Sequence, residues 1–502
     1  HNEYRDVGCG IGIVPMKNKK ISLTERFTKA QQAFTFRDFI LLPGLTEVDP
    51  SEVDIRTKVT TDYSIHVPFV SSPMDTVTED ELAITLARLG GLGVIHRNCT
   101  VEEQIEMARI VKRAESMVIT DVVTAGPGQT VSEAMALMKK YNISGLPVVE
   151  GQRLTGILTA RDVRFARQEE LVGNVMTKKV ITAQEDITLE RASQIMHEHR
   201  IEKLPLTGKS GELKGLITFK DISLRGKYPQ ASRDRTGRLL CAAAASPFDV
   251  ERCRQLDKVV DILVFDVAHF HNKKVMAAAR GLAKDLSANL VIGNIGTRQA
   301  ALDAVSAIEN ANALRVGIGS GSICITSEVT RAGAPTMFAV TQVSDALDEL
   351  GADIPIWADG GITSPGDVAL ALSAGASASM IGNLFARTKE SPGSLVAIGG
   401  QYYKAYRGMG SPSAIAKRHA MDRYTAPAKG IAEGVEGYVP YKGDAATVVA
   451  ELSEGLKVSM GYVGAKNVEE MWGRAKVAWI SQLGSVETRA HDVILPTRGP
   501  PS

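Results

Sequence analysis

The chain has 502 residues, of which 44% are hydrophobic and 23% are charged, and its formal net charge is +1. Together with the lack of an apolar run of roughly 18 residues, this composition is typical of a globular protein of two or three domains and predicts neither a membrane nor a nucleic-acid partner. The five cysteines are scattered and form no CxxC pair, which argues against a disulfide framework or a zinc site and favours a reducing compartment.

The N-terminal stretch has no apolar core of the kind found in signal peptides. We expect residues 1–25 to form an extension that is disordered in part. The Met at position 16, followed by Lys-Asn-Lys-Lys, resembles a more natural start than His1, so residues 1–15 are expected to be an added segment.

Short apolar runs rich in β-formers recur along the chain, and each is followed by a helical pattern. The expected strands are residues 67–71, 92–96, 239–243, 262–266, 290–294, 314–318, 354–359 and 379–382. This number of strand–helix units predicts an α/β fold, the (β/α)₈ TIM barrel, over residues 26–116 and 226–502. About 140 residues separate the second and third strands, and a connection of that length is expected to hold its own domain.

The inserted segment, residues 117–225, contains an internal repeat. Gly-Ile-Leu-Thr-Ala-Arg-Asp at 156–162 matches Gly-Leu-Ile-Thr-Phe-Lys-Asp at 215–221, which indicates two packed copies of one structural unit. Each copy resembles a CBS motif, a paired module that commonly binds adenine or guanine nucleotides. The resemblance implies that the ribose and phosphates of a regulatory nucleotide lie near Thr159, Asp162, Thr218 and Asp221. In the alternative interpretation, these side chains simply cap the helices that follow them.

Unusual sequences follow almost every predicted barrel strand, at the end where barrel enzymes carry their active sites. After the sixth strand, the glycines Gly317, Gly319 and Gly321 lead to Cys324, and Thr326 follows. A nucleophilic thiol needs an exposed, mobile backbone and polar neighbours. The alternative is that Cys324 is a small buried hydrophobe.

Glycines also follow the seventh and eighth strands, at Gly360, Gly361 and Gly382. Loops at these positions commonly bind phosphate in barrels, because backbone N–H groups can approach an anion closely. Asp359 beside them suits a ribose diol, so the loops favour a nucleoside monophosphate, although glycine pairs also form ordinary turns. Asp266 ends the fourth strand and could orient a second sugar. Since no GxGxxG joins a strand to a helix, a nicotinamide cofactor would bind in the barrel mouth.

From about residue 34 to residue 492 the chain resembles the inosine-5′-monophosphate dehydrogenase family, and its sequence is most similar to those of archaeal members. The matching sequences are Ser-Ser-Pro-Met-Asp-Thr-Val-Thr-Glu at 71–79, Gly-Ser-Ile-Cys-Ile-Thr at 321–326, Ala-Asp-Gly-Gly at 358–361, Tyr-Arg-Gly-Met-Gly at 406–410, Asp-Arg-Tyr at 422–424 and Glu-Gly-Val-Glu-Gly at 433–437. The resemblance implies NAD-dependent oxidation of IMP to XMP, the committed step of guanine nucleotide synthesis, by a cytoplasmic homotetramer or octamer.

The resemblance also implies a role for individual residues. Cys324 would add to C2 of the hypoxanthine, and the adduct would lose hydride to NAD⁺ and leave a thioimidate for water to hydrolyse. Arg423 and Tyr424, on a mobile flap at about 411–440, would activate that water, and Thr326 would relay the proton. The implied substrate residues are Ser72, Met74, Ser322, Asp359, Gly361, Gly382, Asn383, Tyr406, Gly408, Met409, Gly410 and Glu433. The implied cofactor residues are Asp266, Asn294, Arg315, Gly317 and Gly319.

A monovalent cation site, usually for K⁺, is a further implication of the family. It would use the carbonyl oxygens of Gly319, Gly321 and Cys324, which suit a large, weakly hydrated cation. A neighbouring subunit would complete it with Glu487, Thr488 and Arg489.

The sequence departs from the one more common in the family at residues 327–336, at Phe270 and Asn272, and at Asn383. Two alternative functions remain open. A GMP reductase shares the barrel and the cysteine, but it has no hydrolytic step and so no use for the Arg423–Tyr424 pair. A non-catalytic nucleotide sensor would signal through the inserted repeat and would leave Cys324 unexplained.

Overall fold

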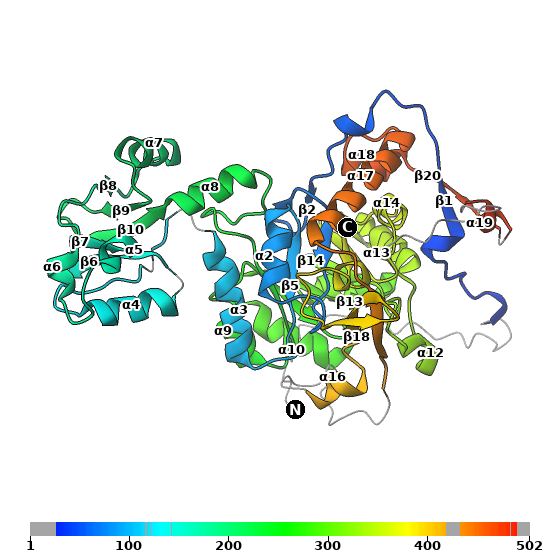
Figure 1. Cartoon of the computed structure of the whole chain (residues 1–502). Helices are drawn as coiled ribbons and strands as arrows, with labels where there is room; N and C mark the ends of the chain where they lie inside the picture. The colour runs from blue at the N-terminus through cyan, green and yellow to red at the C-terminus, as the bar shows by residue number, and fades with distance from the viewer. Residues whose placement is uncertain are drawn as a thin grey trace, which may run out of the picture.

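The protein is represented by a computed structural model that describes residues 27–115, 118–120, 122–141, 143–417, 432–481 and 483–488. Its centre is a closed barrel of parallel strands in the order β11–β12–β13–β14–β15–β16–β4–β5 (Figure 1). The strands are β4 (Phe69–Ser71), β5 (Leu92–Ile95), β11 (Ala242–Ala245), β12 (Ile262–Asp266), β13 (Asn289–Ile295), β14 (Ala311–Val316), β15 (Ile356–Asp359) and β16 (Ala378–Ile381). The predicted barrel is confirmed, and each predicted strand overlaps an observed one.

Strand β11 begins three residues later than the predicted 239–243, and β14 begins three residues earlier than the predicted 314–318. For β11 the cause is that Leu239 and Leu240 belong to a different pairing. Leu239 forms a bridge with Arg233, and the Leu240 N–H donates to the carbonyl of Ser232. The apolar run therefore starts in the segment that re-enters the barrel from the insertion.

One end of the barrel is closed by a short hairpin, β2 (Thr57–Lys58) and β3 (Ser64–Ile65). Val59 and Ile65 of this hairpin join the core inside the barrel. The indole N–H of the fully buried Trp357 donates to the Val59 carbonyl at 2.7 Å. Because the hairpin also binds Asn289 at the start of β13, it covers the N-terminal ends of the strands and leaves the C-terminal ends open.

Helices pack around the barrel and complete a second, outer core. They are α2 (Asp80–Arg88), α3 (Val101–Ala114), α9 (Val250–Leu256), α10 (Lys273–Ala283), α11 (Arg298–Ala307), α13 (Thr336–Leu350), α14 (Pro365–Ser373) and α17 (Ala445–Val463). Several start where a polar side chain caps them, as Thr100 does for α3 and Ser364 for α14. Because helices cover the outside and side chains fill the inside, the strands are buried on both faces.

The inserted segment stands beside the barrel and is reached through α3 and α8, as Figure 1 shows on its left side. Its elements are α4 (Val131–Lys140), β6 (Gly145–Glu150), β7 (Arg153–Thr159), α5 (Ala160–Arg164), α6 (Val172–Val175), β8 (Ala183–Gln184), α7 (Leu189–His199), β9 (Lys203–Thr207), β10 (Leu213–Thr218) and α8 (Phe219–Lys227). The antiparallel pairs β6–β7 and β10–β9 occupy equivalent places in the sequence repeat. Each pair has its own small core.

The remaining elements lie at the rim of the barrel and at the two ends of the described chain. They are η1 (Phe36–Asp38), β1 (Phe39–Leu42), η2 (Pro50–Glu52), α12 (Thr326–Thr330), α15 (Asn383–Ala386), β17 (Leu395–Ile398), β18 (Gln401–Arg407), α16 (Pro412–Ala416), β19 (Glu436–Pro440), α18 (Val468–Arg474), β20 (Lys476–Trp479) and α19 (Gly484–Glu487). Strands β17, β18 and β19 form an antiparallel sheet, and β1 pairs with β20. The predicted extension over residues 1–25 lies outside the described residues.

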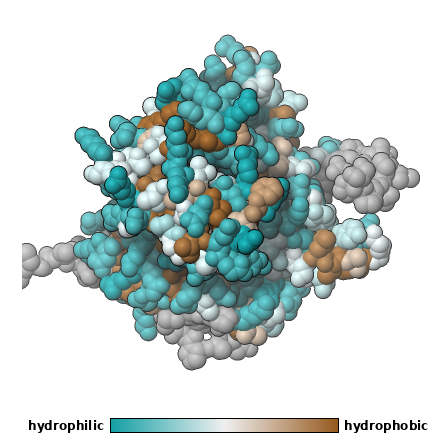
Figure 2. Space-filling model, turned by 60° about the vertical axis from the view of Figure 1, so that its left-hand side comes forward, coloured by the Kyte–Doolittle hydropathy of each residue, from teal (hydrophilic) through white to brown (hydrophobic). Residues whose placement is uncertain are grey.

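The face shown in Figure 2 is mainly hydrophilic, with hydrophobic residues in small separate groups. Of the helices in the described part of the chain, none is long and apolar enough to span a membrane.

Candidate active site

A cavity of about 630 Å³ lies at the C-terminal ends of the barrel strands. Its walls include the end of β13 and the loops after β4, β14, β15 and β16. Residues 406, 408–410 and 433–434, next to strands β18 and β19, complete them. The volume falls within the roughly 300–1,000 Å³ that is usual for small-molecule sites. The predicted location of the site, at the open end of the barrel, therefore coincides with a cavity.

The loop that carries Cys324 connects β14 to α12 and passes close to the end of β15. At Gly317, where φ is 128°, an added Cβ would lie 2.4 Å from the carbonyl oxygen of Asp359. Only glycine fits this close approach. Further along the loop, the Cys324 N–H donates to the Gly321 carbonyl at 3.0 Å, and Cys324 forms a bridge with Gly434. The cysteine is thus held between its own loop and the segment that follows residues 418–431.

Cys324 differs from the other described cysteines in its exposure. Cys99, Cys241 and Cys253 are buried, and burial raises the pKa of each of these thiols to about 12. They are protonated and inaccessible at neutral pH. Cys324 is partly exposed and lines the cavity, so the alternative of a fully buried Cys324 does not hold.

A line of three polar groups starts at the cysteine. The Cys324 thiol donates to the Thr326 hydroxyl over 3.3 Å, and that hydroxyl donates to Oε2 of Glu433 over 3.1 Å. Glu433 is held against the loop because its carbonyl accepts the N–H of Ile325. A proton can therefore pass between the thiol and a carboxylate through a single hydroxyl.

Hydroxyl and amide groups gather at the end of β16. An added Cβ on Gly382 would lie 2.9 Å from the Tyr406 hydroxyl and 3.4 Å from that of Ser72. Burial raises the pKa of Tyr406 to about 12, so its phenol stays a neutral donor. The Asn383 amide donates to the Ser322 hydroxyl at 3.2 Å. These donors suit a phosphate group, because Gly382 has no side chain to block an anion from approaching them.

Asp359, at the end of β15, is oriented by two donors. Its Oδ2 accepts hydrogen bonds from the Asn294 amide at 2.7 Å and from Nε of Arg315 at 2.9 Å. Both bonds end on Oδ2 and not on Oδ1. Its carbonyl accepts the Thr336 hydroxyl at 2.6 Å. The carboxylate is thus fixed beside the cavity with an oxygen that can accept a ligand hydroxyl.

The structure brings nearly all of the predicted barrel residues to this one cavity. The predicted substrate residues in its lining are Ser72, Met74, Ser322, Asp359, Gly361, Gly382, Asn383, Tyr406, Gly408, Met409, Gly410 and Glu433. Cys324, Thr326 and the predicted cofactor residues Asn294, Arg315, Gly317 and Gly319 line it too. Asp266 is not in the lining, because it is only 2% exposed and lies under Arg97 and Arg315.

Some of the predicted residues lie elsewhere. Arg423, Tyr424 and Arg489 fall outside the described residues. Glu487 ends α19 and Thr488 follows it, both exposed. Of the predicted cation ligands, Gly319, Gly321 and Cys324 share the loop after β14.

The predicted regulatory residues cap helices in both repeats. Thr159 donates its hydroxyl and its N–H to the Asp162 carboxylate, each at 2.7 Å, at the start of α5. Thr218 and Asp221 make the matching contact at the start of α8. The capping interpretation therefore describes these side chains in this structure, and nucleotide binding there stays a prediction.

Sequence reasoning missed several residues of the lining. Thr35, Phe36 and Arg37 reach the cavity from η1, and Ile415 reaches it from α16. These residues precede the first barrel strand or follow the last. The prediction considered residues that directly follow barrel strands, so it could not identify them. Among the departures, Phe270 is fully buried and Asn272 caps α10, so both have structural explanations.

The chain matches one protein family over most of its length, and it is similar to several members of that family. The family described as the IMP dehydrogenase / GMP reductase domain matches residues 33–491. The inosine-5′-monophosphate dehydrogenase of Korarchaeum cryptofilum is 52% identical over 93% of this chain and 98% of that protein, and the one of Methanocaldococcus jannaschii is 45% identical over 95% and 98%. A solved GMP reductase from Trypanosoma brucei in complex with guanosine 5′-monophosphate aligns with a TM-score of 0.86 at 34% identity, over 93% of this chain and 100% of that one.

Proposed function

Since this chain belongs to the IMP dehydrogenase / GMP reductase family, we propose that it converts IMP to XMP in the cavity around Cys324. The curated relatives with 45–52% identity over nearly the whole chain are inosine-5′-monophosphate dehydrogenases. The chain is accordingly an NAD-dependent oxidoreductase of guanine nucleotide synthesis, and the prediction made from the motifs is confirmed. The similar GMP reductase structures are relatives in fold at lower identity.

The line Cys324–Thr326–Glu433 is the observation that carries the proposed chemistry. The Cys324 thiol releases its proton to solvent by way of Thr326 and Glu433, and its sulfur forms a bond to C2 of the hypoxanthine. The C2–H bond then breaks with its electron pair, and the product is a thioimidate on Cys324. Bound NAD⁺ supplies the acceptor for that hydride.

Hydrolysis of the thioimidate needs a base at a moment when the cysteine is occupied. Thr326 lies beside the sulfur and already donates to Glu433. It can accept a proton from the attacking water while Glu433 accepts the threonine proton. Water adds to C2, the C–S bond breaks, and the cysteine is released. We assign Arg423 and Tyr424 to the same step on the strength of the family resemblance.

The strand order supports one orientation of IMP. The donors around Gly382, namely Tyr406, Ser322 and Asn383, suit the phosphate after β16. Oδ1 of Asp359 suits the ribose after β15. The hypoxanthine then reaches Cys324 after β14, where Met409, Gly410 and Glu433 also line the cavity.

The nicotinamide side lies in the opposite direction around the barrel. Asn294 and Arg315 each lie one residue before the end of their strands, β13 and β14, and Gly317 begins the cysteine loop. These residues bring amide, guanidinium and backbone groups to the cavity that Cys324 also lines. They fit a nicotinamide ribose better than Asp266 does, since its carboxylate is covered by two arginines.

We also propose the cation site and the assembly. The carbonyl groups of Gly319, Gly321 and Cys324 lie on one tight loop, and oxygen donors of this kind suit K⁺. The exposed Glu487 and Thr488, with Arg489, would come from a neighbouring subunit of a homotetramer or octamer. Turnover that rises with K⁺ and not with Li⁺ at equal ionic strength would support this site.

The segment over residues 117–225 is proposed to be a regulatory CBS pair that binds purine nucleotides at Thr159, Asp162, Thr218 and Asp221. Its two equivalent strand pairs and separate cores support the paired module. A cytoplasmic location is proposed because the described cysteines are free thiols.

Two assays test the proposed function. Purified protein is given IMP with NAD⁺, and separately GMP with NADPH. We expect turnover of the first pair only, whereas turnover of the second pair alone would contradict the proposal. A Cys324→Ala variant should lose turnover. If that variant kept its full biological effect in cells, the nucleotide-sensor alternative would be favoured.

A further inference from the structure

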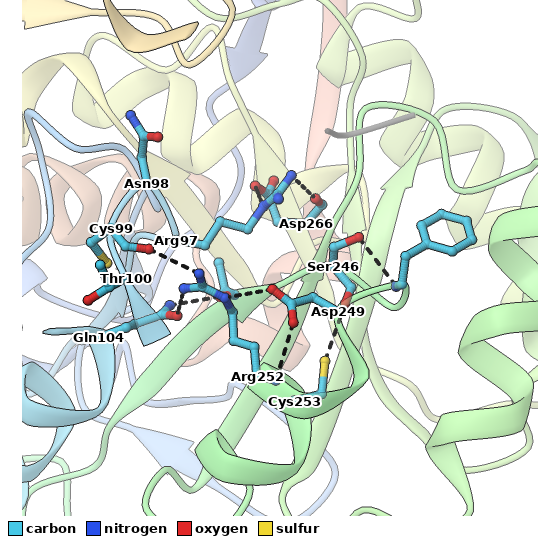
Figure 3. Close-up of polar contacts among 12 residues, drawn as sticks. Arg97, Asn98, Cys99, Thr100, Gln104, Ser246, Asp249, Arg252, Cys253 and Asp266 are labelled. Carbon is cyan, nitrogen blue, oxygen red and sulfur yellow. Dashed lines mark hydrogen bonds and ion pairs between the residues drawn. The ribbon is translucent and has the colours of Figure 1, made fainter. Parts of the chain in front are cut away.

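Arg97 is a buried arginine near the active site that is not among the residues lining its cavity. Figure 3 shows Arg97, which follows β5, with its guanidinium directed at Asp266. Its Nε lies 3.3 Å from Oδ2 of Asp266, and its Nη2 donates to the Asp266 carbonyl at 3.2 Å. Arg97 is 6% exposed and Asp266 is 2% exposed, so the pair is shielded from solvent.

The guanidinium of Arg315 connects this pair to the active site. Arg315 donates from Nη1 to Oδ1 of Asp266 at 2.7 Å and from Nε to Oδ2 of Asp359 at 2.9 Å. Positive and negative groups thus alternate from Arg97 to Asp359, across the ends of β5, β12, β14 and β15. Asp359 is the member that lines the cavity together with Arg315.

We propose that Arg97 is a positioning residue for IMP, acting through Asp266 and Arg315 on Asp359. Arg97 balances the charge of Asp266, and Arg315 can then divide its donors between two carboxylates. Without Arg97, the buried Asp266 would lose one of its counter-charges, and it would draw the Arg315 guanidinium more strongly away from Asp359. This inference rests on the proposed role of Asp359 in holding the ribose.

The loop that carries Arg97 is itself anchored. The fully buried Arg252 donates to the Cys99 carbonyl at 3.0 Å, to Gln104 at 2.7 Å and to Asp249 at 2.9 Å (Figure 3). Strands β5 and β11 are neighbours in the barrel, yet the whole insertion separates them in sequence. The Arg252 contacts join the start of α9, after β11, to the loop after β5 across this gap in sequence, and they hold the Arg97 loop in place.

Arg97→Gln tests the proposal, because it removes the charge and retains polar atoms. We expect KM for IMP to rise by about tenfold, the size of a coupling between contacting charges, with a smaller change in kcat. Arg97→Lys keeps the charge and should recover most of the affinity. The matched control is Arg88→Gln, which breaks a pair with the buried Glu115 away from the cavity. It should lower the melting temperature and leave KM for IMP unchanged.

A double variant shows whether the effect travels through Asp266. Arg97→Gln in an Asp266→Asn background should change KM for IMP by less than about twofold, because no unbalanced charge is left behind. Equal effects in both backgrounds would overturn the proposal. So would an Arg97→Gln protein whose KM for IMP matches the wild type. If Arg97→Gln does not fold, a KM for IMP that is more than about twofold higher in the double variant than in Asp266→Asn would overturn the proposal.

Asp359→Asn separates this inference from the proposed function. If Asp359→Asn leaves KM for IMP unchanged, the assignment of the ribose to Asp359 is wrong. If it raises KM for IMP while Arg97→Gln has no effect, only the role of Arg97 is wrong.

Discussion

The thiol of Cys324 donates to the hydroxyl of Thr326 over 3.3 Å, and only one residue separates the two in sequence. Cys324 ends the loop after β14, and Thr326 begins α12. The nucleophile and its proton carrier are therefore positioned by one turn of backbone. The proton acceptor, Glu433, comes from a segment more than a hundred residues away, so the line from thiol to carboxylate exists only in the folded chain.

Thr326→Val should slow hydrolysis more than hydride transfer. The substitution keeps the shape of the side chain and removes its hydroxyl, which breaks the path to Glu433. We expect a rapid burst of one NADH per site to persist while steady turnover falls by about 100-fold. Thr330→Val is the control, since it removes a hydroxyl from the same helix that contacts only backbone. Equal loss of the burst and of steady turnover would contradict the assignment.

Cys324 should be alkylated selectively by iodoacetamide at pH 8, and IMP should protect it. The other described cysteines are buried and have pKa values of about 12, so they should react far more slowly. Peptide mapping by mass spectrometry identifies the modified site. Because Cys9 lies outside the described residues, a Cys9→Ser background is the matched control. Alkylation of Cys324 that IMP does not slow would contradict its place in the substrate site.

Tyr406→Phe should weaken IMP binding. A lost hydrogen bond to a charged phosphate predicts a rise in KM for IMP of about tenfold or more. Since burial raises the pKa of Tyr406 to about 12, the wild-type phenol stays protonated, and it should cause no rise in KM between pH 7 and 10. Tyr402→Phe, on the same strand with the side chain exposed, should have no effect. A similar change in both variants would argue against a direct role.

Asp234 should contribute to stability at neutral pH and lose that contribution in acid. Burial alone would raise its pKa, but hydrogen bonding and charge from Lys112 lower it from 3.8 to about 2. A depressed pKa stabilises the folded state above the unfolded-state value and ceases to do so as the pH falls from 3.8 toward 2. The contribution is on the order of 2 kcal/mol. Asp234→Asn should lower the free energy of unfolding at pH 7. It should also make that free energy fall less steeply as the pH drops below 4.

The control for Asp234 is Asp353→Asn, whose exposed carboxylate pairs with Lys58 at the surface. It should change the free energy of unfolding by less than about 1 kcal/mol. A decline below pH 4 as steep in Asp234→Asn as in the wild type would contradict the prediction.

Asp221→Ala should reduce the response of the enzyme to purine nucleotides, if the inserted repeat binds them as proposed. The substitution also removes a partner of the helix-capping Thr218, which costs about 1 kcal/mol of local stability. Glu133→Ala removes an equivalent capping contact with Thr130 in the same segment and is the matched control. Turnover is measured with and without ATP or GTP. An equal loss of response in both variants would indicate a structural effect alone.

Much of the fold follows from local sequence patterns. Strand–helix alternation predicted every barrel strand, because the periodicity of burial is a property of neighbouring residues. The error at Leu239 and Leu240 arose because an apolar run does not reveal its pairing partner. The lining by Thr35, Phe36 and Arg37 was missed for a related reason, since these residues reach the site from outside the repeating units.

Local patterns are enough to predict a TIM barrel, a glycine-rich loop with Cys324 after the sixth strand, and the adjacent loops that carry the glycines at 360–361 and 382. They do not predict which side chains contact each other in the folded chain. The line from Cys324 through Thr326 to Glu433 and the chain from Arg97 to Asp359 join segments far apart in sequence. Barrel closure and strand register set those distances, and both depend on the packing of the whole core rather than on any local pattern.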